Sequence, residues 1–527
     1  MTSRTVRRVS PARSYVLFVA AGVALSAACG DSDPSTGGHG GSNTGAGGAG
    51  AAGGAGTGAA GGTADGGDGG AGGATAFKHC TPTSDGKIID ETCGVFVDPS
   101  AAEEGAGTQA SPFATVGAAA ASLNGAPGRI YVCNAGTGVH EAVAVRDGVE
   151  IHGAIDCSVA EWRWDFANRT AWTSDPDTIP LTLSNKLSQN GTEPSLLSGL
   201  TIEAASSAVP GGSSIALVLE SVVVSLDRVD LTANDGSDGT NGTDGVAGDP
   251  GGNGQNANEV SPDNRAAGGT SSCGLAGGLG GYKILTGGFA GTILDGAQGL
   301  PAQNNGGDSV GVGDMTCSAG GPGASAPPGT DGTDGTFASL IVDALGVYGV
   351  DGTDGTSNGH GAGGGGGGAI FGAASYTGGV YPGGGGGAGG CGATPGTAGT
   401  AGGSSIALLS IGSFPSFSDV TLSAGQAGKG GQGGVGKPGG TGGIAGLAYS
   451  DGNGISSCPG GVGGAGSNGG RGGSGTGGSS LLVAYVDNMV DLTGATLNHP
   501  APSQAGVGPG GAKDGVAADQ TMAVRKQ

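Results

Sequence analysis

One apolar phrase returns three times along the chain, as GGSSIALVLE from Gly211, GGSSIALLSI from Gly402 and GGSSLLVAYV from Gly477. In the first copy, Ile215, Leu217 and Leu219 stand at every second position, so we expect them on one face of an extended strand. Alternation over so few residues predicts short β-strands.

A second phrase follows each copy: VDLTA from Val229, VTLSA from Val420 and VDLTG from Val490. It begins 18 residues after the opening glycine in the first two copies and 13 residues after it in the third. Amphipathic helical patterns are missing between these strands, which excludes a doubly wound α/β fold. Strands and corners that repeat in a fixed order predict a β-solenoid with equivalent phrases stacked. An antiparallel sandwich is the alternative.

The N-terminal part of the predicted folded region has its own pattern. GVFVDPS from Gly94 predicts a strand and a turn. A short helix is expected next, with Ser111 as its N-cap, Pro112 at its first position and Asn124-Gly125 at its end. GRIYVC, EAVAV and GVEIHGAI then predict three further strands.

The segments GVFVDPSAAEEGAGTQASPFATVGAAAASL and GRIYVCNAGTGVHEAVAVRDGVEIHGAIDCSVAEWRWD carry a family resemblance. Their order of strand, capping helix and two strand-forming stretches resembles the opening of exported proteins of the pectin-lyase-like superfamily. The resemblance covers residues 94–233. It implies an all-β fold, a right-handed parallel β-helix with a short N-terminal capping helix. The later glycine-rich insertions are PGRS-like in composition only, because the chain has no Pro-Glu N-terminal domain.

Glycine makes up 127 of the 527 residues, far above the usual content of about 7%. It falls at every third position from Gly236 to Gly254 and from Gly460 to Gly478. This period favours polyglycine II helices, which have three residues per turn. Collagen is excluded because the runs are interrupted and proline totals only 24 residues. Unfolded loops are the alternative, so we expect long, partly disordered insertions at the solenoid corners.

These patterns divide the chain into ten parts. They are a signal peptide (1–28), a glycine-rich tether (29–76), N-terminal β-helix rungs with the capping helix (77–233), a glycine-rich insertion (234–335), a short rung (336–348), a second insertion (349–403), a rung (404–424), a third insertion (425–478), the last rung (479–497) and a C-terminal tail (498–527).

The N-terminus MTSRTVRRVSPARSYVLFVAAGVALSAACG has a basic start, an uncharged run too short to span a membrane, and small residues before Cys29. LSAAC resembles the lipobox of bacterial lipoproteins, although Leu25 lies one position further out than usual, with Ser26 in its place. The resemblance implies a lipid at Cys29, which would anchor the exported protein to a bacterial outer membrane or cell surface.

Nine cysteines are an odd number, and eight remain when Cys29 is set aside. An even set in an exported chain predicts disulfides, and the spacings match no CxxC metal motif. Because neighbours in sequence pair most readily, we expect the bridges Cys80–Cys93, Cys133–Cys157, Cys273–Cys317 and Cys391–Cys458.

The three-residue period also aligns carboxylates, which could present oxygen to a hard cation such as Ca²⁺. Solvated turns are the alternative interpretation, since no EF-hand loop or calcium-binding nonapeptide is present. Apart from Ca²⁺, no cofactor is expected. The candidate metal residues are Asp235, Asp238, Asp244, Asp331, Asp334, Asp351 and Asp354.

Catalytic candidates are few. SLDRVDL offers Asp227, Arg228 and Asp230, with Arg228 and Asp230 expected on the same side of a strand, but no second charged cluster is evident. His140 and His152 are interpreted as turn or surface residues. No nucleophile elbow, HExxH motif or P-loop occurs. We therefore expect no catalytic residues.

All three tryptophans fall within eleven residues, and we expect them to cover one end or flank of the solenoid. A carbohydrate-stacking platform is the alternative role for this set, which comprises Trp162, Trp164 and Trp172.

The formal charge of −23 excludes nucleic acid, whose phosphates need clustered Lys and Arg. The sequence predicts a non-catalytic lipoprotein scaffold, structural or adhesive, that displays glycine-rich loops. Its expected partners are the membrane, through the anchor, and cell-surface polysaccharide or other surface proteins. The alternative is a β-helix protein that binds or degrades polysaccharide as a lyase or hydrolase.

Overall fold

The structure is a computed structural model. It describes residues 80–525 except 102–104, 137, 186–192, 259–264, 286–290, 302–304, 311–315, 337–339, 344–345, 372–379, 451 and 453–454. All these residues belong to one unit, Ala74–Gln527. The expected signal peptide, the tether and Cys29 lie outside the described residues. The described part is all-β apart from one α-helix and two 3₁₀ turns, η1 (Glu91–Cys93) and η3 (Pro502–Gln504).

Two large sheets hold most of the strands. The first has the order β1 (Val95–Val97), β2 (Gly128–Cys133), β5 (Val149–Asp156), β9 (Ser195–Ala204), β11 (Val223–Ala233), β19 (Phe414–Ala424) and β21 (Ala495–Asn498), with β3 (Val139–His140), β6 (Arg163–Trp164) and β7 (Thr170–Thr173) paired beside this path. The second has the order β15 (Gly346–Tyr348), β14 (Leu340–Asp343), β22 (Ala517–Arg525), β20 (Ser480–Val486), β18 (Ser405–Ile411), β10 (Ser214–Glu220), β8 (Leu181–Ser184) and β4 (Val143–Arg146).

Strand pairing in both sheets is parallel, except for the pairs β5–β6 and β14–β15. The antiparallel sandwich is therefore wrong. The chain passes from one sheet to the other in turn, from β8 to β9, from β10 to β11, from β18 to β19 and from β20 to β21. Two short antiparallel pairs complete the described strands: β12 (Tyr282–Leu285) with β13 (Gly291–Leu294), and β16 (Ile370–Phe371) with β17 (Val380–Tyr381).

The repeated apolar phrases stack as the sequence predicts. Ser214 of β10 pairs with Ser405 of β18, and Ser405 pairs with Ser480 of β20. Their side chains do not all share one face, however. Leu217 joins the main core between the sheets, whereas Ile215 packs in a second buried cluster. β10 is buried along its whole length, so simple alternation is a poor guide to its faces.

The second phrase of the third copy is misassigned by sequence. Val420 of β19 pairs with Ala495, so ATLN in β21 takes the place that we expected for VDLTG. Ala495 lies 18 residues after Gly477, the same interval as in the first two copies. The stacked strands therefore keep their spacing along the chain, whereas the residue types of the second phrase change. Val490 is buried and precedes the strand.

The long strands of the first sheet share a bend. Gly199, Arg228, Asp419 and Gly494 occupy corresponding positions in the ladder and have φ values of +65°, +54°, +51° and +86°. A left-handed residue between two extended stretches turns the strand, at a cost of about 1–2 kcal/mol when it carries a Cβ. Each long strand is therefore two straight stretches joined at a corner.

The single helix, α1 (Val116–Ser122), starts later than the sequence predicts. Its N-cap is Thr115, whose side chain accepts the N–H of Ala118, so the assignment of Ser111 as the cap is wrong. The Glu141 carboxylate accepts the N–H of Val116 over 2.6 Å. The predicted stop holds, because Asn124 and Gly125 have φ values of +50° and +74° just after the helix.

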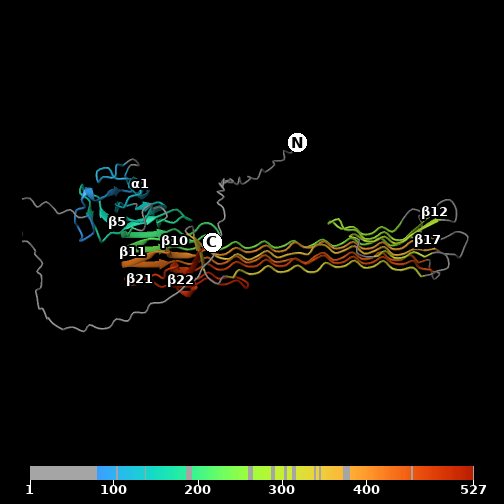
Figure 1. Cartoon of the computed structure of the whole chain (residues 1–527). Helices are drawn as coiled ribbons and strands as arrows, with labels where there is room; N and C mark the ends of the chain where they lie inside the picture. Colours follow the sequence, from blue (N-terminus) through green and yellow to red (C-terminus); the bar gives the residue numbers. More distant parts are fainter. Residues whose placement is uncertain are drawn as a thin grey trace, which may run out of the picture. The chain divides into compact units, whose positions relative to one another are not determined.

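The last residues of the chain belong to the second sheet. β22 lies between β20 and β14, so the region expected to be a C-terminal tail contributes a central strand. The short rung expected at 336–348 stacks on β22 rather than beside the strands that flank it in sequence. In Figure 1 the strands of the two large sheets, around β10, β11 and β22, form one body, here called the strand body. The glycine-rich segments run side by side from it to β12 and β17.

Candidate functional site

Six glycine-rich segments, here called the glycine bundle, comprise residues 236–257, 320–335, 350–365, 385–403, 426–447 and 460–478. Every third N–H from Gly236 to Ala257 donates to a carbonyl of segment 426–447 over 2.8–3.0 Å. This three-residue repeat of hydrogen bonds between neighbouring chains is that of polyglycine II. For these residues the polyglycine II prediction is confirmed, and the unfolded alternative is wrong.

Segment 385–403 shows why glycine is required inside the bundle. One row of its N–H groups, every third from Gly385 to Gly403, donates to segment 236–257. A second row, starting at Gly387, donates to segment 460–478. A Cβ added to Gly399 would lie 2.1 Å from the carbonyl oxygen of Gly431, so any side chain there would push the two backbones apart.

Exposure follows the same period. In segment 426–447 every third residue is exposed, from Gln426 and Lys429 to Ile444 and Leu447, while glycines in a second row, such as Gly428, are buried. Each turn therefore directs one residue to solvent and the other two toward neighbouring chains. The exposed row holds all the non-glycine residues of this segment except Ala427, Lys437 and Ala445.

The predicted metal ligands have a backbone role in this bundle. The Oδ1 atoms of Asp235, Asp238 and Asp244 accept N–H groups of segment 426–447 over 2.7, 2.7 and 2.8 Å. Asn241, in the same row, accepts the N–H of Gln432 over 2.8 Å. Because an amide does the same work as a carboxylate, the contact depends on an acceptor oxygen and not on charge.

The other four candidates make equivalent contacts. Asp331 and Asp334 accept the N–H groups of Arg471 and Ser474, each over 2.9 Å. Asp351 and Asp354 accept those of Ala401 and Ala398, each over 2.7 Å. We call all these positions the acceptor rows. They satisfy backbone donors that point away from the glycine contacts.

One position without an acceptor agrees with this interpretation. The residue that pairs with Ala247 by register is Pro438, which has no N–H to donate, so an acceptor side chain at Ala247 would have nothing to bind.

Geometry within a row does not bring the carboxylates together. Three residues of a polyproline-type helix rise about 9 Å, whereas Ca²⁺ needs six to eight oxygens at about 2.3–2.6 Å. Cations of the protein itself pair with some of them. Lys437 lies 2.9 Å from Asp244 and Arg471 lies 3.1 Å from Asp334, and these hydrogen-bonded partners lower the pKa of both carboxyl groups.

The structure has four disulfides among the described residues, and half of the predicted pairing is correct. Cys80–Cys93 and Cys133–Cys157 are confirmed, whereas the other two expected pairs are wrong. The structure instead pairs Cys273 with Cys391 and Cys317 with Cys458. Packing of glycine-rich segments that are distant in sequence brings these cysteines together, so proximity along the chain misleads.

The tryptophans are buried. Trp172 belongs to the main core, while Trp162 and Trp164 pack in a separate cluster with Phe96 and Tyr131. Their exposed fractions are 3% or less, so the carbohydrate-stacking role is wrong for all three. Only Trp162 and Trp164 form a cluster apart from the main core, so the expected common position of the three tryptophans holds for these two at most.

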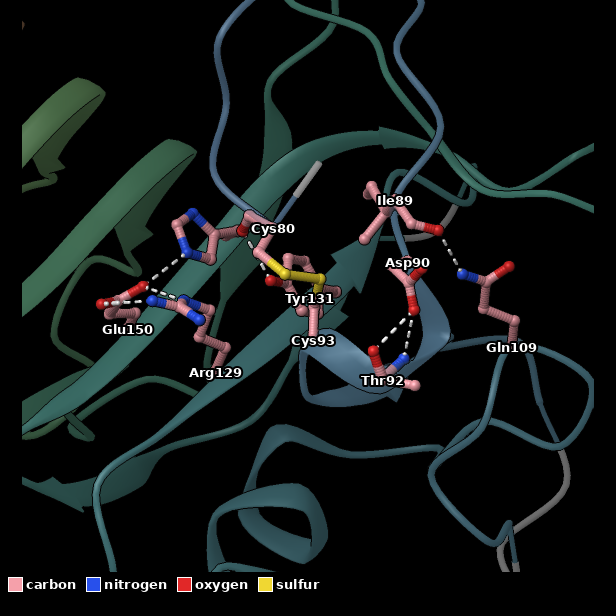
Figure 2. Close-up of a disulfide and its surroundings, with 10 residues drawn as sticks. Cys80, Ile89, Asp90, Thr92, Cys93, Gln109, Arg129, Tyr131 and Glu150 are labelled. Atoms are coloured by element: carbon pink, nitrogen blue, oxygen red, sulfur yellow. Dashed lines mark hydrogen bonds and ion pairs between the residues drawn. A yellow bond between two sulfur atoms is a disulfide. The ribbon is translucent and has the colours of Figure 1, made fainter. Parts of the chain in front are cut away.

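A polar group lies beside this aromatic cluster (Figure 2). The Tyr131 hydroxyl donates to the carbonyl oxygen of Cys80 over 2.6 Å, and burial raises the pKa of Tyr131. Glu150 lies 2.5 Å from Arg129 and 3.2 Å from His152. The hydrogen bond from His152, followed by that from Arg129, lowers the pKa of Glu150 to about 2.

The two histidines considered from sequence differ. His152 is fully buried and stacks on Tyr131, so its assignment to a turn or the surface is wrong. Burial lowers the pKa of His152, which keeps the ring neutral. His140 is exposed as expected, with Asp175 3.1 Å away.

The charged cluster in β11 is tied into ion pairs. Arg228 is the left-handed residue of the strand; it lies 2.9 Å from Asp227 and 4.0 Å from the ring centroid of Phe166. Asp230 instead pairs with Arg169, which also contacts Asp419 over 3.0 Å. The bend at Arg228 breaks the alternation that would place Arg228 and Asp230 together. The cluster therefore stabilises neighbouring strands.

No family model, curated protein or solved structure matches the chain. Among the described residues, no helix is both long and apolar enough to cross a membrane.

The acceptor rows predict a difference between two substitutions at one position. Asp238→Ala removes the acceptor for the Lys429 N–H and should lower the free energy of unfolding by about 1 kcal/mol. Asp238→Asn keeps an acceptor oxygen and should stay close to the wild type. Chemical denaturation of the three proteins, repeated with EDTA, measures both effects. Equal loss in both variants, or a loss on chelation, would indicate that the charge matters.

The low pKa of Glu150 predicts a pH dependence. A carboxyl group with a folded-state pKa of about 2, against an ordinary 4.5, contributes stability above pH 4.5 that is lost as the pH falls toward 2. Glu150→Gln should remove about 1–2 kcal/mol of this dependence, after allowing for solvent screening. Unfolding free energies from pH 6 to about pH 2 test this, with exposed Glu161→Gln as the control. Parallel curves for wild type and Glu150→Gln would contradict the assignment.

Proposed function

We propose that this chain is an exported, lipid-anchored structural protein whose glycine bundle holds a surface away from the membrane. The observation that supports this most directly is the continuous backbone hydrogen bonding of the six glycine segments. At about 3.1 Å per residue, segment 236–257 alone spans roughly 65 Å. Such a bundle suits spacing or adhesion, with cell-surface polysaccharide or other surface proteins as partners.

For the strand body we propose a right-handed parallel β-helix. Three features support it: successive strands alternate between two parallel sheets, equivalent phrases pair in register, and the long strands of the first sheet bend at a left-handed residue. One coil would then consist of a strand such as β10 and the two straight stretches of β11. The bundle would leave this solenoid at one corner and return to it several times.

Cysteine pairing supports export and anchoring. The eight other cysteines pair among themselves, which sets Cys29 apart from the structural bridges. Stable disulfides belong to oxidising compartments outside the cytosol. A lipid on Cys29 would place the tether, residues 29–76, between the membrane and the folded part.

A polysaccharide lyase or hydrolase is the second candidate, and the structure favours it less. Such enzymes need carboxylates, or a carboxylate with an Arg, converging on one groove. Asp227 and Asp230 are each paired with an Arg, and the three tryptophans are buried. A structural scaffold does not need these carboxylates to be unpaired or these tryptophans to be exposed.

Replacement of the anchoring cysteine tests the proposal. Cys29→Ser should move the protein from the membrane fraction to the soluble fraction of the expressing cell and remove a diacylglyceryl mass, because the lipid has no other attachment site. Non-reducing peptide mapping should still show the four bridges, and Cys80→Ser serves as the control that keeps the anchor. Unchanged membrane association of Cys29→Ser would refute the anchored-scaffold proposal.

A further inference from the structure

Two cysteines and a histidine meet at the glycine bundle. His360 and Cys391 belong to its segments 350–365 and 385–403, and Cys273 lies in a turn outside the six segments, yet their sulfur atoms and one ring nitrogen all lie within 4.8 Å of one another. Cys391 is buried, with 6% of its surface exposed, and His360 is exposed to solvent. This arrangement combines a protected interior with an open side.

Backbone contacts position these residues independently of the disulfide. Cys391 donates its N–H to the carbonyl of Asp249 over 2.9 Å, within the hydrogen-bond row between segments 385–403 and 236–257. Cys273 lies in a tight turn in which Ser271 donates its N–H to the carbonyl of Leu275 over 2.9 Å. Breaking the sulfur–sulfur bond would leave both of these contacts in place.

His360 belongs to an acceptor row, where an imidazole is not needed. Its Nδ1 accepts the N–H of Gly392 over 2.9 Å, as the carboxylates of Asp354 and Asp351 accept the N–H groups of Ala398 and Ala401. Asn241 shows that an amide also suffices. The chain therefore uses a metal-binding side chain at the position in this row that adjoins two sulfur atoms.

Each sulfur also has a hydroxyl beside it. Ser271 Oγ lies 3.2 Å from Cys273 Sγ, and Ser272 Oγ lies 3.5 Å from Cys391 Sγ. Ser272 donates its hydroxyl proton to Asp249 over 2.6 Å, so it lies beside Cys391 without donating to it. The Ser271 hydroxyl can donate to the Cys273 thiolate and thereby stabilise the anionic ligand.

We propose that reduction of the Cys273–Cys391 disulfide converts this cluster into a Zn²⁺ site with Cys273, Cys391 and His360 as ligands and water in the fourth position. A neutral imidazole has one nitrogen lone pair for bonding, so His360 gives up its contact with the Gly392 N–H when it binds the metal. A thiol or dithiol reductant supplies two electrons and two protons, giving two thiols and an oxidised reductant. Binding of Zn²⁺ to the two thiols then releases two protons. Zinc–sulfur distances of about 2.3 Å require the sulfurs to separate to roughly 3.7 Å, which rotation of the two side chains can provide.

The bundle contains its own control. Cys317 and Cys458, each just before a bundle segment, form the other bridge in the glycine-rich region, and no third His, Cys, Asp or Glu ligand joins them among the described residues. The other described group near a disulfide, Asp98 with Cys133 and Cys157, lies in the strand body and has no histidine. Zinc binding is therefore best measured as a difference between variants.

The test uses the full-length protein, oxidised or reduced with a phosphine under anaerobic conditions. Bound Zn²⁺ is counted after equilibrium dialysis, and Co²⁺ is added separately to record the absorption of a tetrahedral thiolate site. His360→Asn is the decisive variant, because the amide can keep the contact with the Gly392 N–H while the imidazole is lost. Cys273→Ser/Cys391→Ser removes both sulfur ligands, and Cys317→Ser/Cys458→Ser is the matched control.

Reduced wild type should bind one more equivalent of Zn²⁺ than the oxidised protein. That equivalent should be lost in Cys273→Ser/Cys391→Ser, weakened at least about tenfold in His360→Asn, and kept in Cys317→Ser/Cys458→Ser. Failure of the reduced wild type to bind Zn²⁺ would overturn the proposal. So would equal affinity in His360→Asn, or the same loss in Cys317→Ser/Cys458→Ser.

Discussion

Backbone hydrogen bonds between chains that lack a Cβ are the interaction on which the rest of this structure depends. Glycine loses more conformational entropy on ordering than any other residue, so a chain with 127 glycines starts at a disadvantage. The bundle offsets that loss by pairing N–H groups in several directions, and two disulfides join stretches of chain within or next to its segments. A Cβ at Gly399 would remove this possibility locally, because it would meet the opposing backbone at 2.1 Å.

The strand body sets the register of the bundle. Ser214 pairs with Ser405 in the sheets, 191 residues further along the chain, and the same offset joins Asp235 to Gln426 and Asn256 to Leu447. Stacked strands and glycine segments therefore form one uninterrupted alignment. A polyglycine helix has few side chains to specify its register, and here the register comes from the apolar phrases next to it and from the acceptor rows.

Sequence predicts the parts of this structure that depend on local period. The apolar phrases predict the stacked strands, and the three-residue glycine period predicts the polyglycine II segments. What it misses depends on partners far away in the chain. Asp238 makes its contact 191 residues away, so local sequence alone suggests a metal ligand where the structure has a backbone acceptor. Cys273 pairs across 118 residues, against the preference for near neighbours. The sequence does contain one further signal: the 18-residue interval, which identifies Ala495 rather than Val490 as the start of the second strand in the third copy.

Amide hydrogen exchange of the native protein tests the central claim, that the glycine segments are ordered by their own backbone hydrogen bonds. Peptides covering 385–403 and 426–447 should exchange as slowly as those covering β10 and β18, because their N–H groups are hydrogen-bonded in several rows and their glycines are buried or half-buried. Exchange of the glycine peptides at the rate of an unfolded chain, while β10 and β18 stay protected, would contradict the account.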